Sequence, residues 1–204
     1  MITPLAASVA RSIAARIAAR AADDALGDTM PDLPSLEGHV VIAGFGRVGR
    51  LIAEILERQQ IPYVALDNDA AAVGEHHRRG TPVFVGDAGR AELLKALGVQ
   101  AASTVVLTMD DAQAALRAVH AIRAESRDVA ILARARDEPH ALALLEAGAT
   151  SVIPEALEAG LQLAGAVIGQ CGMPHEAVQV LIDQQRALRM PGVQAPSKTG
   201  DAGD

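Results

Sequence analysis

Residues 39–49 read His-Val-Val-Ile-Ala-Gly-Phe-Gly-Arg-Val-Gly, and this stretch decides the fold. The apolar run Val40–Ala43 leads directly into the spacing Gly44-x-Gly46-x-x-Gly49, and apolar side chains then recur at the spacing of a helix. A strand, a glycine turn and a helix in this order are typical of the first unit of a dinucleotide-binding fold. The alternative is a chance glycine-rich turn in an α/β domain.

Each glycine of this motif has a separate physical role. Gly44 allows the tight turn, Gly46 lets the backbone approach a pyrophosphate, and Gly49 lets the helix pack closely on the strand. The free N–H groups and the positive dipole end of the helix then face the phosphates. The predicted phosphate-binding residues are Gly44, Phe45, Gly46, Arg47, Val48 and Gly49.

An acidic residue ends the second predicted strand. Asp67 follows the apolar segment 62–66, about twenty residues after the glycine motif, where a carboxylate accepts hydrogen bonds from ribose hydroxyls. Because an acid there repels a 2′-phosphate, AMP or NAD(H) is favoured over NADP, with Asn68 beside it. The alternative role for Asp67 is to cap the next helix, but Asp69 fits that role better.

Strands and helices alternate along most of the chain. The predicted strands are 39–44, 62–67, 82–86, 103–108, 129–134 and 150–153. The predicted helices between them are 47–59, 69–79, 89–97, 111–125 and 138–147, three of them followed by C-cap glycines, Gly80, Gly98 and Gly148. This pattern predicts an α/β, Rossmann-like, doubly wound parallel sheet of six strands in the order 3-2-1-4-5-6.

Segments on either side complete the predicted organisation. Residues 1–36 contain a helix whose charges are all arginine until Asp23, followed by a linker. This helix is either solvated or a basic segment beside a membrane. Residues 37–153 form the Rossmann domain, and 154–190 form a C-terminal helical arm with helices 155–170 and 175–189. Helix 155–170 is too apolar to be solvated all round, so it packs either on its own domain or on a second subunit. We expect it to contribute to a dimer contact. Residues 191–204 are expected to be disordered.

Composition excludes several classes of protein. The 204 residues carry a net charge of −7 and a pI near 5.3, which argues against a general nucleic-acid binder. The single cysteine, Cys171, rules out an internal disulfide framework and fits a reducing compartment. The sequence has no apolar run of the length that a membrane span requires, and no motif for a metal.

Polar residues also follow the remaining strands, at the rim where such sheets bind ligands. Asp87 and Ala88 follow strand three. Asp87, through its side chain or the neighbouring backbone, either reaches an adenine amino group or caps the helix at Gly89. Thr108 follows strand four, with Asp110 or Asp111 expected to cap the next helix. At the end of strand five, Arg134 and Arg136 lie two apart on one face and suit phosphate, carboxylate or a partner's acidic patch.

Residues 39–170 resemble the RCK or TrkA-N (KTN) domain of potassium transport systems, most closely that of Kef-type potassium efflux systems. These are potassium/proton antiporters. A departure from the family is Gly89, since threonine often follows Gly-Asp-Ala. The resemblance rests on Val41–Gly49, Leu66–Asp69, Val85–Ala88, Ala133–Asp137, His140 and Ala147–Gly148.

The resemblance implies a regulatory domain and no enzyme. It implies a domain that binds AMP or NAD(H), with glutathione as a second ligand in part of the group, and that gates an antiporter. In the full antiporters a transmembrane unit precedes this domain, which forms a homodimer at the cytoplasmic face of the inner (plasma) membrane. No nucleic-acid partner is expected. The chain would then be a fragment of a longer protein.

Two alternatives remain. One is an NAD-dependent oxidoreductase, which needs a proton-transfer group near the nicotinamide. Only Tyr63, Lys95 and Lys198 supply phenol or amine groups, and each is expected away from the site. The other is a free-standing regulatory subunit of a potassium transporter.

Overall fold

The computed structural model describes residues 36–190. The predicted helix near the start of the chain, most of the linker and the predicted disordered tail lie outside this range. The sheet is parallel throughout and its order, β3-β2-β1-β4-β5-β6, confirms the prediction. The strands are β1 (Val40–Ala43), β2 (Tyr63–Asp67), β3 (Val83–Val85), β4 (Thr104–Leu107), β5 (Ala130–Ala135) and β6 (Ser151–Pro154).

The helices also agree with the prediction to within a few residues. A short 3-10 turn, η1 (Val99–Ala101), was not predicted and precedes β4. Within 36–190 the helices are α2 (Arg47–Arg58), α3 (Ala70–Arg78), α4 (Ala91–Ala96), α5 (Ala112–Glu125), α6 (Glu138–Glu146), α7 (Glu155–Gln170) and α8 (His175–Arg189).

Local residue chemistry sets where these helices begin and end. Asp69 caps α3 and Asp111 caps α5, each accepting hydrogen bonds from two backbone N–H groups. The bond from the Ala114 N–H is the main cause that lowers the pKa of Asp111. The three predicted C-cap glycines, Gly80, Gly98 and Gly148, have φ of +84°, +67° and +109°, which confirms their role.

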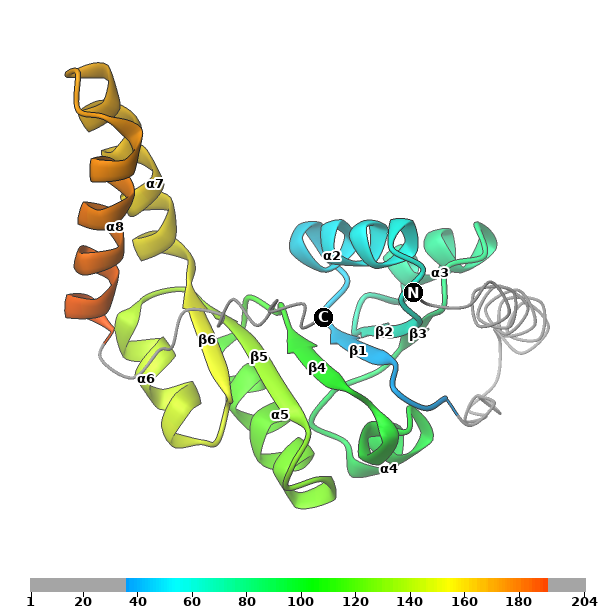
Figure 1. The fold of residues 1–204 in the computed structure, drawn as a ribbon. Helices are drawn as coiled ribbons and strands as arrows, with labels where there is room; N and C mark the ends of the chain where they lie inside the picture. Colours follow the sequence, from blue (N-terminus) through cyan, green and yellow to red (C-terminus); the bar gives the residue numbers. More distant parts are fainter. Residues whose placement is uncertain (1–35, 191–204) are drawn as a thin grey trace, which may run out of the picture.

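The sheet is covered unequally on its two faces. Helices α4, α5 and α6 cover one face, whose core is built from small aliphatic side chains such as Val41, Leu107, Ile122 and Ile131. On the other face α2 and α3 cover β1, β2 and β3 over a second apolar cluster, against which Val106 of β4 also packs. Among residues 36–190, no helix lies over β5 and β6 on this second face (Figure 1). Leu132 and Ile153 are accordingly 38% and 58% exposed there.

The arm is a helical hairpin, α7–α8, which projects away from the sheet beside β6 (Figure 1). Its helices pack through Leu161, Val178 and Ile182. Arg186 of α8 bonds both carboxylate oxygens of Glu158 on α7, at 2.7 and 3.0 Å. No helix within 36–190 is long and apolar enough to cross a bilayer.

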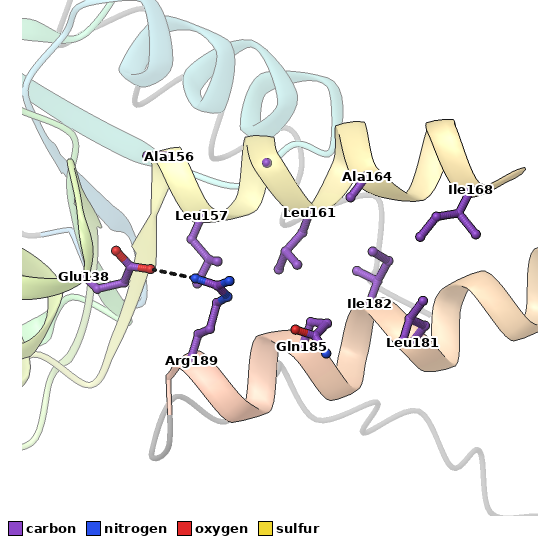
Figure 2. A pocket seen from close by; sticks show the side chains of 11 residues that line it. Glu138, Ala156, Leu157, Leu161, Ala164, Ile168, Leu181, Ile182, Gln185 and Arg189 are labelled. Atoms are coloured by element: carbon purple, nitrogen blue, oxygen red, sulfur yellow. Dashed lines mark ion pairs between the residues drawn. The ribbon is translucent and has the colours of Figure 1, made fainter. Parts of the chain in front are cut away.

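A groove of about 590 Å³ runs between the two arm helices (Figure 2). Its walls are mainly aliphatic side chains that point toward one another, among them Leu157 and Leu181. At the end nearest the sheet, Arg189 lies 4.0 Å from the Glu138 carboxylate of α6. This contact, the connection to β6 and the packing of Leu157 and Met190 on the core of the sheet are among the contacts that join the arm to the Rossmann unit.

Candidate functional site

The glycine turn between β1 and α2 has the geometry that the sequence predicts. Gly44 has φ +97°, and a Cβ there would lie 2.9 Å from the Met109 nitrogen. A Cβ on Gly49 would lie 2.1 Å from the Gly44 carbonyl oxygen. These two glycines are therefore required by the protein's own packing.

Gly46 differs from the other two glycines because, in the part of the chain that the structure describes, nothing lies within 4 Å of a Cβ built on it. It is the N-cap residue of α2, and no side chain within residues 36–190 accepts a hydrogen bond from the first N–H groups of that helix. The positive end of the α2 dipole therefore meets open space, which is the arrangement that binds phosphate in such folds. Arg47 is exposed next to it, and Val48 is half-buried.

Asp67 joins the glycine turn to the end of β2. Its Oδ2 accepts a hydrogen bond from the Phe45 N–H at 2.5 Å, and its Oδ1 accepts one from the Asp69 N–H at 2.9 Å. Since each carboxylate oxygen has two lone pairs, both can accept another hydrogen bond. The carboxylate is thus held in a fixed orientation beside the turn. Asn68 is exposed on the same rim.

Phe45 contributes only its backbone to this part of the rim. Its side chain is buried beneath α2 and α3 and meets the His76 ring edge-on, with 5.2 Å between ring centroids. This packing fixes the direction of the Phe45 N–H toward Asp67.

At the end of β3, Asp87 stabilises a turn. Its Oδ1 accepts a hydrogen bond from the Gly89 N–H at 2.8 Å, while α4 begins two residues later with Arg90 as its N-cap residue. The predicted capping role of Asp87 is therefore wrong, because its bond to Gly89 holds the turn before α4 and does not cap that helix. Ala88 is buried against the core.

Thr108 connects β4 to the glycine turn. Its buried hydroxyl donates to the Gly44 carbonyl oxygen at 2.7 Å, and its N–H donates to the Ala43 carbonyl oxygen at 2.8 Å. Of the two acids that follow, Asp111 caps α5 and Asp110 remains exposed in the loop.

Arg134 is already engaged by the protein itself. Its Nη1 donates to the Thr108 carbonyl oxygen at 3.2 Å and to Asp110 Oδ1 at 2.6 Å, and its Nε donates to Glu155 Oε2 at 2.7 Å. Its Nη2 forms an ion pair with the same Glu155 oxygen. Partial burial acts to lower the pKa of Arg134, but the bonds to the two carboxylates outweigh it and the pKa is raised.

Glu155 is the residue that sequence reasoning missed. It was interpreted only as the start of a helix. The signal was indirect: Arg134 is the register partner of Ile153 in β6, so Glu155, two residues further on, falls at the same rim. Glu155 is also the first residue of α7. Its ion pair with Arg134 therefore connects the predicted ligand-binding rim to the arm.

Arg136 is the freer of the two predicted guanidiniums. Its side chain is 72% exposed, and its Nε lies 3.4 Å from Asp137 Oδ2. Its backbone N–H donates to His140 Nδ1 at 3.3 Å, so the other ring nitrogen of His140 carries the proton. That nitrogen is buried without a hydrogen-bond partner in the described range.

Within residues 36–190, the phenol and amine groups considered for proton transfer lie away from this rim. Burial raises the pKa of Tyr63, and its hydroxyl donates to Glu57 on α2 at 2.5 Å. Lys95 of α4 lies 3.6 Å from Glu125 of α5, on the face of the sheet that α4, α5 and α6 cover. Lys198 lies outside the described range. In the part of the chain that the structure describes, no three His, Cys, Asp or Glu side chains are grouped to hold a metal.

The family model described as the TrkA-N domain matches residues 40–155, which contain β1 to β6 and every rim residue discussed above. The chain belongs to the TrkA-N family. Relatives of this TrkA-N chain also show its resemblance to Kef-type potassium efflux systems.

Two curated relatives are potassium efflux antiporters. One, from Alkalimonas amylolytica and assigned as the K(+) efflux antiporter KefB, is 40% identical over 154 residues. The other, the chloroplastic K(+) efflux antiporter 2 of Arabidopsis thaliana, is 39% identical over 155 residues. Each alignment covers 76% of the TrkA-N chain, but only 23% and 13% of the respective relatives.

Solved structures share the fold. The Kef C-terminal domain of Shewanella denitrificans in its AMP-bound form has a TM-score of 0.64 and 28% identity, over 74% of this chain and 91% of that one. The TrkA-N domain of the inner membrane protein ybaL from Escherichia coli has a TM-score of 0.61 and 27% identity, over 64% and 97%. The GsuK channel bound to NAD, at 23% identity and a TM-score of 0.62 over 68% and 25%, shares the fold alone.

Proposed function

We propose that this TrkA-N chain is a non-catalytic regulatory domain that binds an adenine nucleotide and gates an attached potassium/proton antiporter. The observation that carries the proposal is the uncapped start of α2 at Gly46, with the fixed carboxylate of Asp67 beside it. The turn offers free N–H groups to phosphate, and Asp67 offers lone pairs to ribose hydroxyls. The relatives, which are potassium efflux antiporters, support the transport context.

The proposed ligand is AMP or NAD(H). A carboxylate at the end of β2 accepts hydrogen bonds from an unphosphorylated ribose and repels a 2′-phosphate, so NADPH binds worse. AMP is the ligand of the Shewanella Kef domain and NAD that of the GsuK channel. Adenine would lie near the turn at Asp87 and Ala88. Glutathione is the proposed second ligand, with the exposed Arg136 as one contact for its carboxylates.

Calorimetric titration of the 204-residue chain with AMP, ATP, NAD, NADH and NADPH tests this function. We expect AMP or NAD(H) to bind and NADPH to bind at least tenfold more weakly. The NAD-dependent oxidoreductase alternative predicts turnover of NADH with hydroxy acids or aldehydes, and a screen of both classes separates it. Failure of all five nucleotides to bind would refute the proposed function.

We propose further that two copies pair through the arm, so that each antiporter subunit has a symmetric regulatory partner at the cytoplasmic face of the membrane. Leu163 and Val167 of α7 lie one turn apart and are 68% and 56% exposed. Leu161 points inward and belongs to the hairpin's own core. Exposed aliphatic residues in this pattern favour a contact. In the free-standing subunit alternative the same dimer would dock on a separate transporter.

The paired variant Leu163→Glu, Val167→Glu is expected to convert the dimer to a monomer, because four charges would enter the symmetric contact. Light scattering at micromolar concentration measures the change. Leu142→Glu is the control, since Leu142 is an exposed leucine on α6, and this variant should remain dimeric. A monomeric unmodified chain would contradict the proposal.

A further inference from the structure

Four residues form a continuous connection from the glycine turn to the arm. Thr108 bonds the Gly44 carbonyl oxygen with its hydroxyl and accepts from Arg134 with its own carbonyl oxygen. Arg134 then binds Asp110 in the β4–α5 loop and Glu155 at the first residue of α7. We call Thr108, Asp110, Arg134 and Glu155 the Arg134 clasp.

The guanidinium of the clasp has two edges with different neighbours. Its Nη1 faces the loop after β4, where it bonds Thr108 and Asp110. Its Nε and Nη2 face Glu155 and hence the arm. The single positive charge of Arg134 is thus shared between the carboxylates of Asp110 and Glu155. The loop after β4, beside Arg134, is where ligands bind in a sheet of this order.

We infer that the Arg134 clasp couples nucleotide binding at Gly44–Gly49 to the position of the α7–α8 arm, because a bound phosphate and Glu155 compete for Arg134. This inference rests on the proposed function. A phosphate at the glycine turn adds negative charge on the Nη1 side, next to Asp110. The guanidinium then turns toward the phosphate, the bond to Glu155 breaks, and the base of α7 is released. The arm remains attached through β6, through the contact between Arg189 and Glu138, and through Leu157 and Met190, which pack on the core of the sheet.

Reciprocity gives this coupling a second consequence. If the nucleotide weakens the bond between Arg134 and Glu155, then removing that bond must strengthen nucleotide binding. Glu155→Gln keeps the size of the side chain and removes its charge. Because the Glu155 side chain is 52% exposed, this variant does not bury a new polar group.

The matched control is Glu158→Gln. Glu158 forms an equally close ion pair, with Arg186, but that pair joins the two helices of the arm and does not contact the rim. Asp110→Asn is a second variant of the clasp, which removes the carboxylate on the Nη1 side.

Two measurements test the clasp on the 204-residue chain. Calorimetry gives the AMP and NAD affinities. Spin labels on Cys171, which is exposed at the tip of the arm, and on Ala124→Cys in α5 give the distance between arm and Rossmann unit by dipolar spectroscopy. Labelled chains are diluted into unlabelled Cys171→Ser chains, so that distances within one chain dominate.

We expect nucleotide to shift the Cys171–Ala124 distance distribution in the otherwise unmodified chain. In Glu155→Gln the distribution without ligand should already match the bound one, and the nucleotide affinity should rise about fivefold. Asp110→Asn should also bind more tightly, whereas Glu158→Gln should behave as the unmodified chain. Binding without a shift, or a shift unchanged by Glu155→Gln, would overturn the clasp and leave the proposed function intact. Absence of nucleotide binding would overturn both.

Discussion

Gly49→Ala is expected to destabilise the Rossmann unit by about 3 kcal/mol or more, since overpacking at a site that cannot relax reaches the upper end of its usual cost. The new methyl group would lie 2.1 Å from the carbonyl oxygen of Gly44. This oxygen is a backbone atom, located where the turn leaves the central strand β1. The same Cβ would also lie 3.1 Å from the Thr108 hydroxyl. Either α2 moves away from β1 or the turn opens, and both break apolar packing.

Gly46→Ala is the matched control for this prediction. Gly46 has φ −73° and no neighbour within 4 Å of its Cβ, so alanine should leave the free energy of unfolding within about 0.5 kcal/mol. Its methyl group would instead occupy the space next to the α2 N–H groups, so nucleotide binding should fall at least tenfold. Urea denaturation measures the first effect and calorimetry the second. Equal stability losses in both variants would contradict the assignment of separate roles to the two glycines.

Asp67→Ala is expected to weaken AMP or NAD(H) binding by about 1–3 kcal/mol, or about fivefold to 150-fold, because ribose hydroxyls lose their acceptor. The variant also removes the acceptor for the Phe45 N–H, so the shape of the turn changes as well. Asp67→Asn limits the second effect, since its amide oxygen can still accept from Phe45 while the charge and the bond from the Asp69 N–H are lost. NADPH should bind more tightly to this variant than to the unmodified chain.

The control for Asp67 is Asp69→Ala. Asp69 lies two residues away and caps α3 through the N–H groups of Ala71 and Ala72. Its loss should cost about 1 kcal/mol of stability with nucleotide affinity unchanged. An Asp67→Ala variant with undiminished affinity would show that the ribose is held by another part of the rim.

Most of the fold could be predicted from the sequence because its signals are local. Apolar segments of strand length, glycines that require positive φ and acidic caps such as Asp69 act within a few residues of their own position. The 3-10 turn at Val99–Ala101 was missed because three residues carry no periodicity. The strand order followed from a general rule for sheets that begin with the glycine motif.

The sequence predicts which residues of the site lie at the ends of strands, but not the hydrogen bonds that they form with one another. The position of Asp67 could be inferred, but its bond to Phe45 depends on the path of a turn 22 residues earlier. Arg134 was interpreted as a cation available to a ligand, since its partners Asp110 and Glu155 lie 24 and 21 residues away in the chain. Such pairs depend on register and rotamer, and sequence spacing does not encode them.

The central position of β1 also governs how the chain folds. Val40–Ala43 pairs with β2 on one side and, on the other, with β4, whose residues Thr104–Leu107 are made much later by the ribosome. Until β4 emerges, the first half of the domain has an open edge at its most apolar strand. Pairings of such long sequence separation are slow to form. The first half of a nascent chain of this kind therefore stays partly exposed until the second half has been made. We expect a chain truncated before β4 to be an intermediate that aggregates.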